Sequence, residues 1–135
     1  MVNFDEGLIM RIGFIGLGNV GGKLASNLFN NNFDLMVFDK DSEILNQFKN
    51  KGSKVASSIE ELVFNNDILI TCLPSPEACN EVIESSKGIA AYIKENQIWM
   101  EMSTTDEDQL KKHALLIESK KACLLYTSPS PRDRG

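Results

Sequence analysis

The chain has 135 residues, which is enough for one domain with its own core but short for a two-domain enzyme. Its composition, 42% hydrophobic and 24% charged, is ordinary for a soluble globular protein, and no apolar run approaches the roughly 20 residues of a membrane helix. The net charge of -5 gives no basic field, so we expect no nucleic-acid partner and no membrane partner, although backbone amides can still hold an anion locally.

The N-terminus and the cysteines indicate the cellular compartment. Residues 1–9 carry two acids and no basic segment, so they do not resemble a secretory signal. We interpret them as a non-native extension that precedes a natural start at Met10. Cys72, Cys79 and Cys123 are an odd set without a CxxC pair, which fits structural thiols in a reducing cytoplasm better than disulfides or a zinc site. We therefore expect a cytoplasmic protein without a bound metal.

The first half of the chain alternates short apolar runs with helical patterns. Asp41 or Ser42 is expected to cap the second helix, and Ser58 with Glu61 forms a capping box for the third. The predicted elements are strands at residues 11–15, 34–38 and 54–56, and helices at 19–31, from 42 to near 52, and at 59–64.

The second half continues the alternation. We predict strands at residues 67–73 and 97–102 and helices at 77–86, at 89–94 and from Thr105 onward. The strand at 67–73 is a continuous apolar run, typical of a central parallel strand that is covered on both faces. In the last helix Leu110, Ala114 and Ile117 share a face, whereas His113 lies among lysines and is expected on a solvated face. The whole order predicts an α/β fold with a doubly wound parallel sheet.

Glycines are concentrated between the first strand and the first helix, in a GxGxxG pattern. In such a strand-loop-helix unit the first glycine permits a tight turn, the second lets a pyrophosphate approach, and the third allows close packing of helix on strand. The helix N-terminus then offers free amides to the phosphates. The alternative is that the glycines serve packing alone. The predicted dinucleotide contacts are Gly16, Leu17, Gly18, Asn19, Val20 and Gly21.

An acidic residue at the end of the second strand indicates which dinucleotide binds. Asp39 follows Gly21 by 18 residues, where a carboxylate can accept hydrogen bonds from the adenosine ribose hydroxyls. A 2'-phosphate would be repelled by this carboxylate, although the neighbouring Lys40 partly offsets the repulsion. We therefore predict NAD as the cofactor, with NADP as the alternative.

Two further stretches lie at strand ends, where open α/β sheets bind their ligands. "LPSP" at residues 73–76 follows the fourth strand, and "MSTTD" at 102–106 follows the fifth. Leu73 and Pro74 are expected to pack against the ribose and nicotinamide, and Thr104 offers a hydroxyl. Taken singly, each stretch has a simpler explanation, since proline ends strands and threonine caps helices.

Together "FIGLGNVGGKLASN", "LPSPEA" and "MSTTD" resemble the NAD(P)-binding half of the β-hydroxyacid dehydrogenases, from Met10 to about Ala122. The family includes 3-hydroxyisobutyrate dehydrogenases and glyoxylate/succinic semialdehyde reductases. The chain departs from the family at three positions: Val20 and Leu24 replace methionines, and Glu101 replaces an aspartate.

The resemblance implies the cofactor contacts named above, with Ala78 near the nicotinamide end, and reversible hydride transfer to or from a small hydroxy acid. In the family a second, helical domain supplies a catalytic lysine and the protein is a homo-oligomer at full length. Neither this lysine nor the substrate-binding serine loop is found here, so we assign no catalytic residue and expect the fragment to be inactive.

The tail "CLLYTSPSPRDRG" at residues 123–135 does not continue the expected pattern. Its letters resemble translated adapter DNA from sequencing libraries, so we predict that the dinucleotide-binding domain comprises residues 10–122, is incomplete at its C-terminal end, and is followed by an artefact. A genuine proline-rich terminus is the alternative.

Two other protein classes share the glycine loop. A stand-alone nucleotide-sensing module of the potassium-transport type needs no catalytic half and would fit the short chain, but it has no use for the Leu-Pro and Ser-Thr pairs. A Rossmann-like interaction domain that has lost its nucleotide is the third interpretation.

Overall fold

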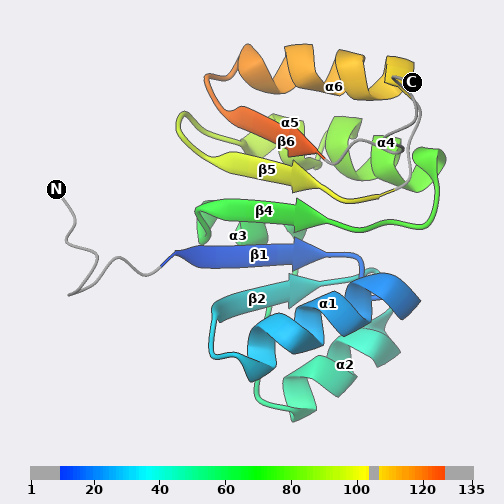
Figure 1. Cartoon of the computed structure of the whole chain (residues 1–135), viewed down its shortest axis with the longest axis vertical. Coiled ribbons are helices and arrows are strands. Elements are labelled where there is room, and N and C mark those ends of the chain that lie inside the picture. Colours follow the sequence, from blue (N-terminus) through cyan, green and yellow to red (C-terminus); the bar gives the residue numbers. More distant parts are fainter. Residues whose placement is uncertain (1–9, 104–106, 127–135) are drawn as a thin grey trace, which may run out of the picture.

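A computed structural model describes residues 10–103 and 107–126 of the chain. Its centre is a six-stranded sheet with the order β3-β2-β1-β4-β5-β6, in which all pairs are parallel (Figure 1). The strands are β1 (Arg11–Ile15), β2 (Asp34–Phe38), β3 (Lys54–Val55), β4 (Ile68–Thr71), β5 (Ile98–Glu101) and β6 (Cys123–Tyr126). The helices are α1 (Asn19–Asn30), α2 (Ser42–Asn50), α3 (Ile59–Phe64), α4 (Pro76–Glu84), α5 (Ile89–Tyr92) and α6 (Glu107–Glu118). This strand order confirms the predicted doubly wound α/β fold.

Helix starts follow the capping residues in the sequence, with one difference. Asp41 accepts a hydrogen bond from the Glu43 amide, and Ser58 accepts one from the Glu61 amide. The Glu61 carboxylate, however, accepts from the amide and hydroxyl of Ser57 and not from the Ser58 amide. The predicted capping box is therefore only half formed, because its carboxylate reaches one residue further back.

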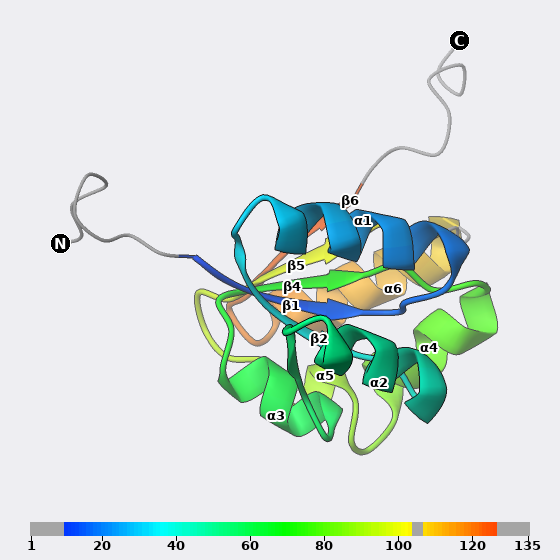
Figure 2. The same ribbon diagram turned by 90° about the horizontal axis from the view of Figure 1, so that it is seen from below.

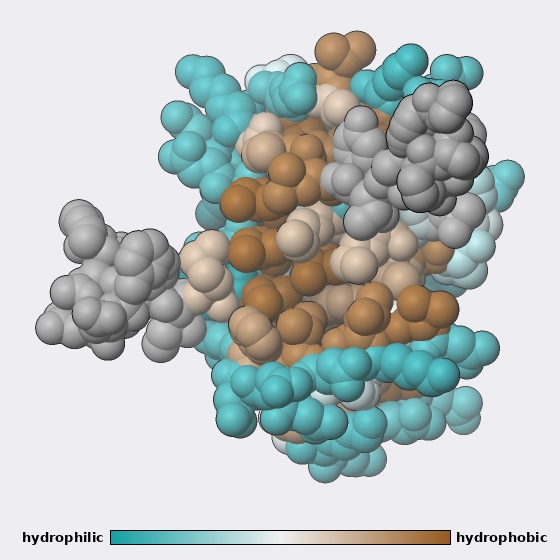
Figure 3. Space-filling view, in the orientation of Figure 1, coloured by the Kyte–Doolittle hydropathy of each residue, from teal (hydrophilic) through white to brown (hydrophobic). Residues whose placement is uncertain are grey.

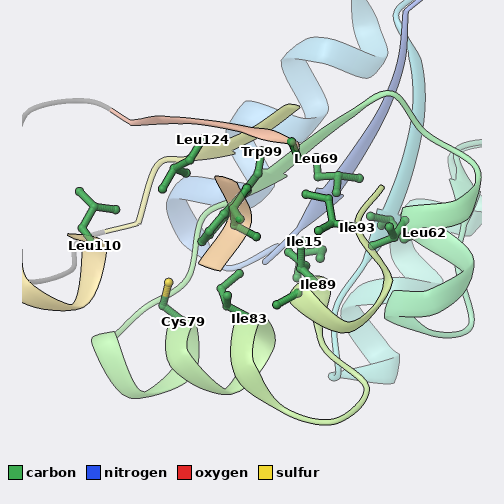
Figure 4. Packing of buried hydrophobic residues seen from close by; sticks show 14 of the residues in the cluster. Ile15, Leu62, Leu69, Cys79, Ile83, Ile89, Ile93, Trp99, Leu110 and Leu124 are labelled. Atoms are coloured by element: carbon green, nitrogen blue, oxygen red, sulfur yellow. The ribbon is translucent and has the colours of Figure 1, made fainter. Parts of the chain in front are cut away.

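Helices lie on both faces of the sheet (Figure 2), and each face has its own core. Residues alternate across the strands, so Phe14 points toward α1 and α2 while Ile15 points toward the other helices. The larger core joins α3, α4, α5 and α6 to the sheet around Trp99, which is fully buried (Figure 4). Because four helices share this core, it fixes the β4 and β5 ends relative to α4.

The α1 face of the sheet is covered less completely than predicted. Ile70 is 6% exposed beneath the α1 and α2 core, but Ile68, Ile98 and Met100 on the same face are only half-buried. Leu125 pairs with Met100 in register and is 45% exposed. On this side of the molecule Figure 3 shows a brown, apolar area beside α1. Among the described residues, β4 is thus fully covered on one face only.

The sheet also extends beyond the predicted boundary at Ala122. Cys123–Tyr126 form β6, whose residues pair with Ile98–Glu101 in parallel register. The four apolar or aromatic letters "CLLY" suit an edge strand, and the backbone of Cys123 donates to Gln97. Excluding this segment from the fold was therefore wrong. The predicted origin of residues 123–135 stays a prediction, and residues 127–135 lie outside the described ranges.

His113 is buried, which corrects the prediction of a solvated face. Its side chain is fully enclosed between α6 and α4, where Nε2 lies 3.0 Å from the Glu84 carboxylate and the ring lies 5.8 Å from that of Trp99. The sequence neighbours Lys111 and Lys112 are exposed, but residue 113 falls on the same helix face as Leu110 and Ile117. The predicted start at Thr105 lies outside the described residues.

The burial of His113 predicts a pH-dependent stability. Burial lowers the pKa of His113 below its ordinary 6.5, and this effect outweighs the opposing attraction of the Glu84 carboxylate. In the unfolded chain His113 therefore takes up a proton as the pH falls through about 6.5, whereas in the folded chain it does so only at a lower pH. The free energy of unfolding consequently falls as the pH drops below about 6.5.

His113→Gln keeps a donor toward Glu84 but cannot titrate, so it should lose less stability between pH 7.5 and 5.5 than the wild type. Thermal unfolding followed by circular dichroism at both pH values checks this. Equal pH dependence in the two proteins would show that another group is responsible.

Candidate functional site

A cleft of about 890 Å³ opens at the carboxyl ends of the central strands. It lies where the strand order reverses between β1 and β4, the position at which doubly wound sheets bind ligands. Most of the predicted contacts line it: Gly16, Gly18, Asn19, Val20, Gly21, Asp39, Leu73, Pro74 and Ala78. Leu17 does not, because its side chain is buried in the α1 core, and Thr104 lies outside the described residues.

The three motif glycines are required for different reasons. Gly16 has a φ of +104°, and a Cβ there would collide with the Cys72 carbonyl. A Cβ on Gly21 would collide with the Gly16 carbonyl, so α1 packs directly on the turn. A Cβ on Gly18, in contrast, would have no atom within 4 Å, because this position faces open space at the cleft. Gly18 thus leaves a backbone cradle that a ligand can enter.

The start of α1 suits an anionic group. Gly18 is the N-cap and makes no side-chain hydrogen bond, and the first turn contains no acidic residue. The first amides of a helix have no acceptor within the helix and carry partial positive charge. Asn19 and Val20 are exposed and line the cleft, so their amides are available there as donors for phosphate oxygens. Val20 is 64% exposed there, because the first turn of α1 overhangs the cleft and not the sheet.

Asp39 has a second role that the sequence pattern did not indicate. One carboxylate oxygen accepts a 2.8 Å hydrogen bond from the Leu17 amide, and the other accepts one of 2.8 Å from the Asp41 amide. The side chain thereby ties the glycine turn to the β2 end. Each oxygen keeps a further lone pair for a ligand hydroxyl. The neighbouring Lys40 is exposed and also lines the cleft.

The fold brings the two predicted strand-end stretches together at the other end of the cleft. The Leu73 amide donates a 2.7 Å hydrogen bond to the Ser103 hydroxyl, which joins the β4 turn to the segment after β5. Leu73, Pro74, Met102 and Ser103 form this wall. Ala78 lies in the first turn of α4, which begins at Pro76 with Ser75 as its cap.

Sequence reasoning missed part of the lining. Ser57, Ser58 and Ile59 lie after β3 and could have been found by the strand-end rule that identified Asp39. Lys87 and Tyr92 come from the α4–α5 region, where no sequence pattern marked a site. Cys72 also lines the cleft, but burial raises the pKa of its thiol, so it is a poor nucleophile at neutral pH.

Three findings concern metal sites, membrane helices and cysteines. Within residues 10–103 and 107–126, histidine, cysteine and acidic side chains form no group that could hold a metal ion. Over the same ranges, no helix is both long and apolar enough to pass through a bilayer. All three cysteines are free thiols.

Comparisons with known proteins agree with this geometry. Residues 11–128 match the family described as the NAD binding domain of 6-phosphogluconate dehydrogenase. The mitochondrial 3-hydroxyisobutyrate dehydrogenase of Mus musculus is 36% identical over 107 residues, which are 79% of this chain and 32% of the mouse protein. The human cytokine-like nuclear factor N-PAC is 28% identical over 110 residues, or 82% of this chain and 20% of that protein. The chain thus spans about a third of the dehydrogenases it matches.

Solved structures share the fold. The 3-hydroxyisobutyrate dehydrogenase of Mycobacterium tuberculosis, solved with L-serine, superposes with a TM-score of 0.76 at 24% identity, covering 88% of this chain and 40% of that one. Psf3 in complex with NADP+ and 2-OPP gives a TM-score of 0.80 at 21% identity, covering 84% and 40%. The predicted resemblance to the hydroxyacid dehydrogenases is confirmed, since 3-hydroxyisobutyrate dehydrogenases are among the relatives of this chain. The chain belongs to the family of the NAD-binding domain of 6-phosphogluconate dehydrogenase.

Proposed function

We propose that this chain is the cofactor-binding part of an oxidoreductase that interconverts a small 3-hydroxy acid, or a related hydroxy acid, and its semialdehyde or oxo acid. The observation that carries the proposal is the pairing of a side-chain-free cradle at Gly18 with the Leu73–Ser103 wall in one cleft. The cradle suits a pyrophosphate, and the wall offers the apolar side chains of Leu73 and Pro74 to the nicotinamide end. Relatives named 3-hydroxyisobutyrate dehydrogenase support the substrate class.

Each part of the cleft then has a role. The α1 amides hold the phosphates, Asp39 accepts hydrogen bonds from the adenosine ribose, and Leu73 with Pro74 supports the nicotinamide end, beside Ala78. When bound, NAD supplies the hydride acceptor for alcohol oxidation. Thr104, which follows the Ser103 wall, is proposed to add a hydroxyl to the same contacts.

Oxidation of an alcohol also needs a proton acceptor, and we assign this role to no residue of the described lining. Cys72 is a protonated thiol, and the only histidine of the chain is buried between α4 and α6. By resemblance, the base is a lysine of a second domain, which residues 1–135 do not include. We propose that the complete enzyme is a homo-oligomer without nucleic-acid or membrane partners. A cytoplasmic location stays a prediction, since the mouse and Dictyostelium relatives are named mitochondrial.

The glycine geometry predicts that substitutions at two glycines of one motif have different effects. Gly18→Val places a side chain in the open cradle, so it should raise the Kd for NADH at least about tenfold with little change in melting temperature. Gly21→Ala forces α1 away from the Gly16 carbonyl, so its main effect should be a lower melting temperature. NADH fluorescence titration and thermal unfolding measure the two effects. Unchanged affinity in Gly18→Val would refute the proposed phosphate site.

Asp39 predicts a preference for NAD over NADP. The wild type should bind NAD more tightly, because a 2'-phosphate meets the carboxylate. Asp39→Asn removes the charge and keeps one acceptor oxygen, enough for only one of the two amides that Asp39 holds. It should weaken NAD binding and reduce the preference for NAD over NADP by about tenfold. Competition titrations against NADH measure both affinities. A wild type that binds NADP equally well would show that Lys40 outweighs Asp39.

The missing base predicts that residues 1–135 bind NAD and yet produce no NADH from 3-hydroxyisobutyrate, 4-hydroxybutyrate, glycerate or glycolate. A chimera that adds the remaining part of a 3-hydroxyisobutyrate dehydrogenase after Tyr126 should gain activity. Activity of residues 1–135 alone would mean that the base lies in this chain. A folded chimera that binds NADH but stays silent would favour the stand-alone nucleotide-sensing module.

A further inference from the structure

Behind the wall of the cleft lies a buried carboxylate that the proposed cofactor contacts do not include. Glu101 is the last residue of β5 and is 2% exposed. It does not line the cleft, but the next two residues, Met102 and Ser103, do. A buried acid is expensive unless its oxygens are hydrogen-bonded, so the partners of Glu101 indicate what the side chain does.

One oxygen of Glu101 organises both strand ends. Oε1 accepts a 2.7 Å hydrogen bond from the Ser103 amide and a 2.8 Å hydrogen bond from the Thr71 hydroxyl. Ser103 in turn accepts from the Leu73 amide through its hydroxyl. A continuous series of hydrogen bonds therefore connects the carboxylate to the Leu73 backbone at the cleft surface.

The other oxygen reaches α4. Oε2 accepts a 2.6 Å hydrogen bond from the Cys79 thiol, one residue after Ala78. Burial, with a further contribution from Glu101, raises the pKa of Cys79 well above its usual range, so the sulfur remains a protonated donor. Figure 4 shows Cys79 on α4 and Trp99 on β5 within the same core.

The only tryptophan of the chain reports on this network. Trp99 Nε1 donates a 2.9 Å hydrogen bond to the Thr71 hydroxyl, which then donates to Glu101. A change at Glu101 should therefore alter the surroundings of the indole. No other tryptophan contributes to the emission of the protein.

We propose that Glu101 is the positioning residue for the nicotinamide-side wall: its carboxylate holds the β4 turn, the start of α4 and the segment after β5 in one arrangement. This inference rests on the proposed cofactor site. Glu101 acts on the cofactor through Ser103, Leu73 and Ala78 and does not touch it. The orientation of the wall, and with it the affinity for NADH, depends on an acceptor atom at the Oε1 position.

Two substitutions of similar size separate this role from simple packing. Glu101→Gln keeps an oxygen that can accept from Ser103 and Thr71, while its amide can donate to the Cys79 sulfur. Glu101→Met fills a similar volume but offers no such acceptor, and it leaves the Ser103 amide and the Thr71 hydroxyl without their partner. The two variants thus differ chiefly in the acceptor.

The test is an NADH titration of the wild type and both variants, followed by energy transfer from Trp99, with thermal unfolding in parallel. Glu101→Gln should stay within about twofold of the wild-type Kd, whereas Glu101→Met should raise the Kd about tenfold and shift the Trp99 emission of the free protein. Equal Kd values for the two variants would overturn the inference.

Ile117→Val controls for lost stability, because Ile117 is fully buried in the same core but lies on α6 away from the wall. It should lower the melting temperature and leave the Kd unchanged. A comparable rise in Kd for this control would mean that the affinity follows global stability, and would also overturn the inference.

If Glu101→Met does not fold, Ser103→Ala decides the question. This variant keeps the amide bonded to Glu101 and cuts only the link to Leu73, so it should raise the Kd several-fold. An unchanged Kd would refute the series of hydrogen bonds. Failure of the wild type itself to bind NADH would refute the proposed function together with this inference, whereas binding without a Gln/Met difference would refute this inference alone.

Discussion

The position of α1 depends on a contact between two stretches of backbone. Gly21 in the helix lies against the carbonyl of Gly16, and Gly16 lies under the carbonyl of Cys72 at the β4 end. Three chain segments therefore meet without any side chain between them. A single methyl group at either glycine would push the helix outward, which would move its free amides and widen the cleft floor. The distance between the phosphate cradle and the β4 wall is set by this packing.

The cleft also shows how an acidic chain can hold an anion. The net charge is -5, so attraction cannot come from the protein as a whole. It comes from the amide dipoles at the α1 start, which act over a few ångströms. Asp39 lies close to these donors, but its oxygens accept hydrogen bonds from the amides of Leu17 and Asp41. These hydrogen bonds reduce the repulsion between its negative charge and an anion at the loop. The ion pair of Arg11 with Asp67 lies at the opposite end of the sheet and is exposed. It contributes little to the attraction of an anion into the cleft.

Local patterns in the sequence were enough for the fold class, for strands β1 to β5, and for the glycine cradle and Asp39. Apolar periodicity located the strands because a parallel sheet must bury them, and the glycine spacing located the cradle because no other residue fits at Gly16. The rest depends on contacts between distant segments. Cys79 and Glu101 are 22 residues apart and meet only when α4 packs on β5. His113 was misplaced because exposed lysines precede it, although its burial depends on the α4 surface that it faces.

The start of α1 lowers the stability of the protein when no ligand is bound. With Gly18 as N-cap, the helix lacks the side-chain acceptor that Ser58 gives to α3, so its first turn is left energetically incomplete. A ligand that binds only the folded state adds stability in proportion to the logarithm of its concentration, about 2.7 kcal/mol at 100 times its Kd. The ligand-free chain therefore unfolds more readily and is exposed to proteases for longer.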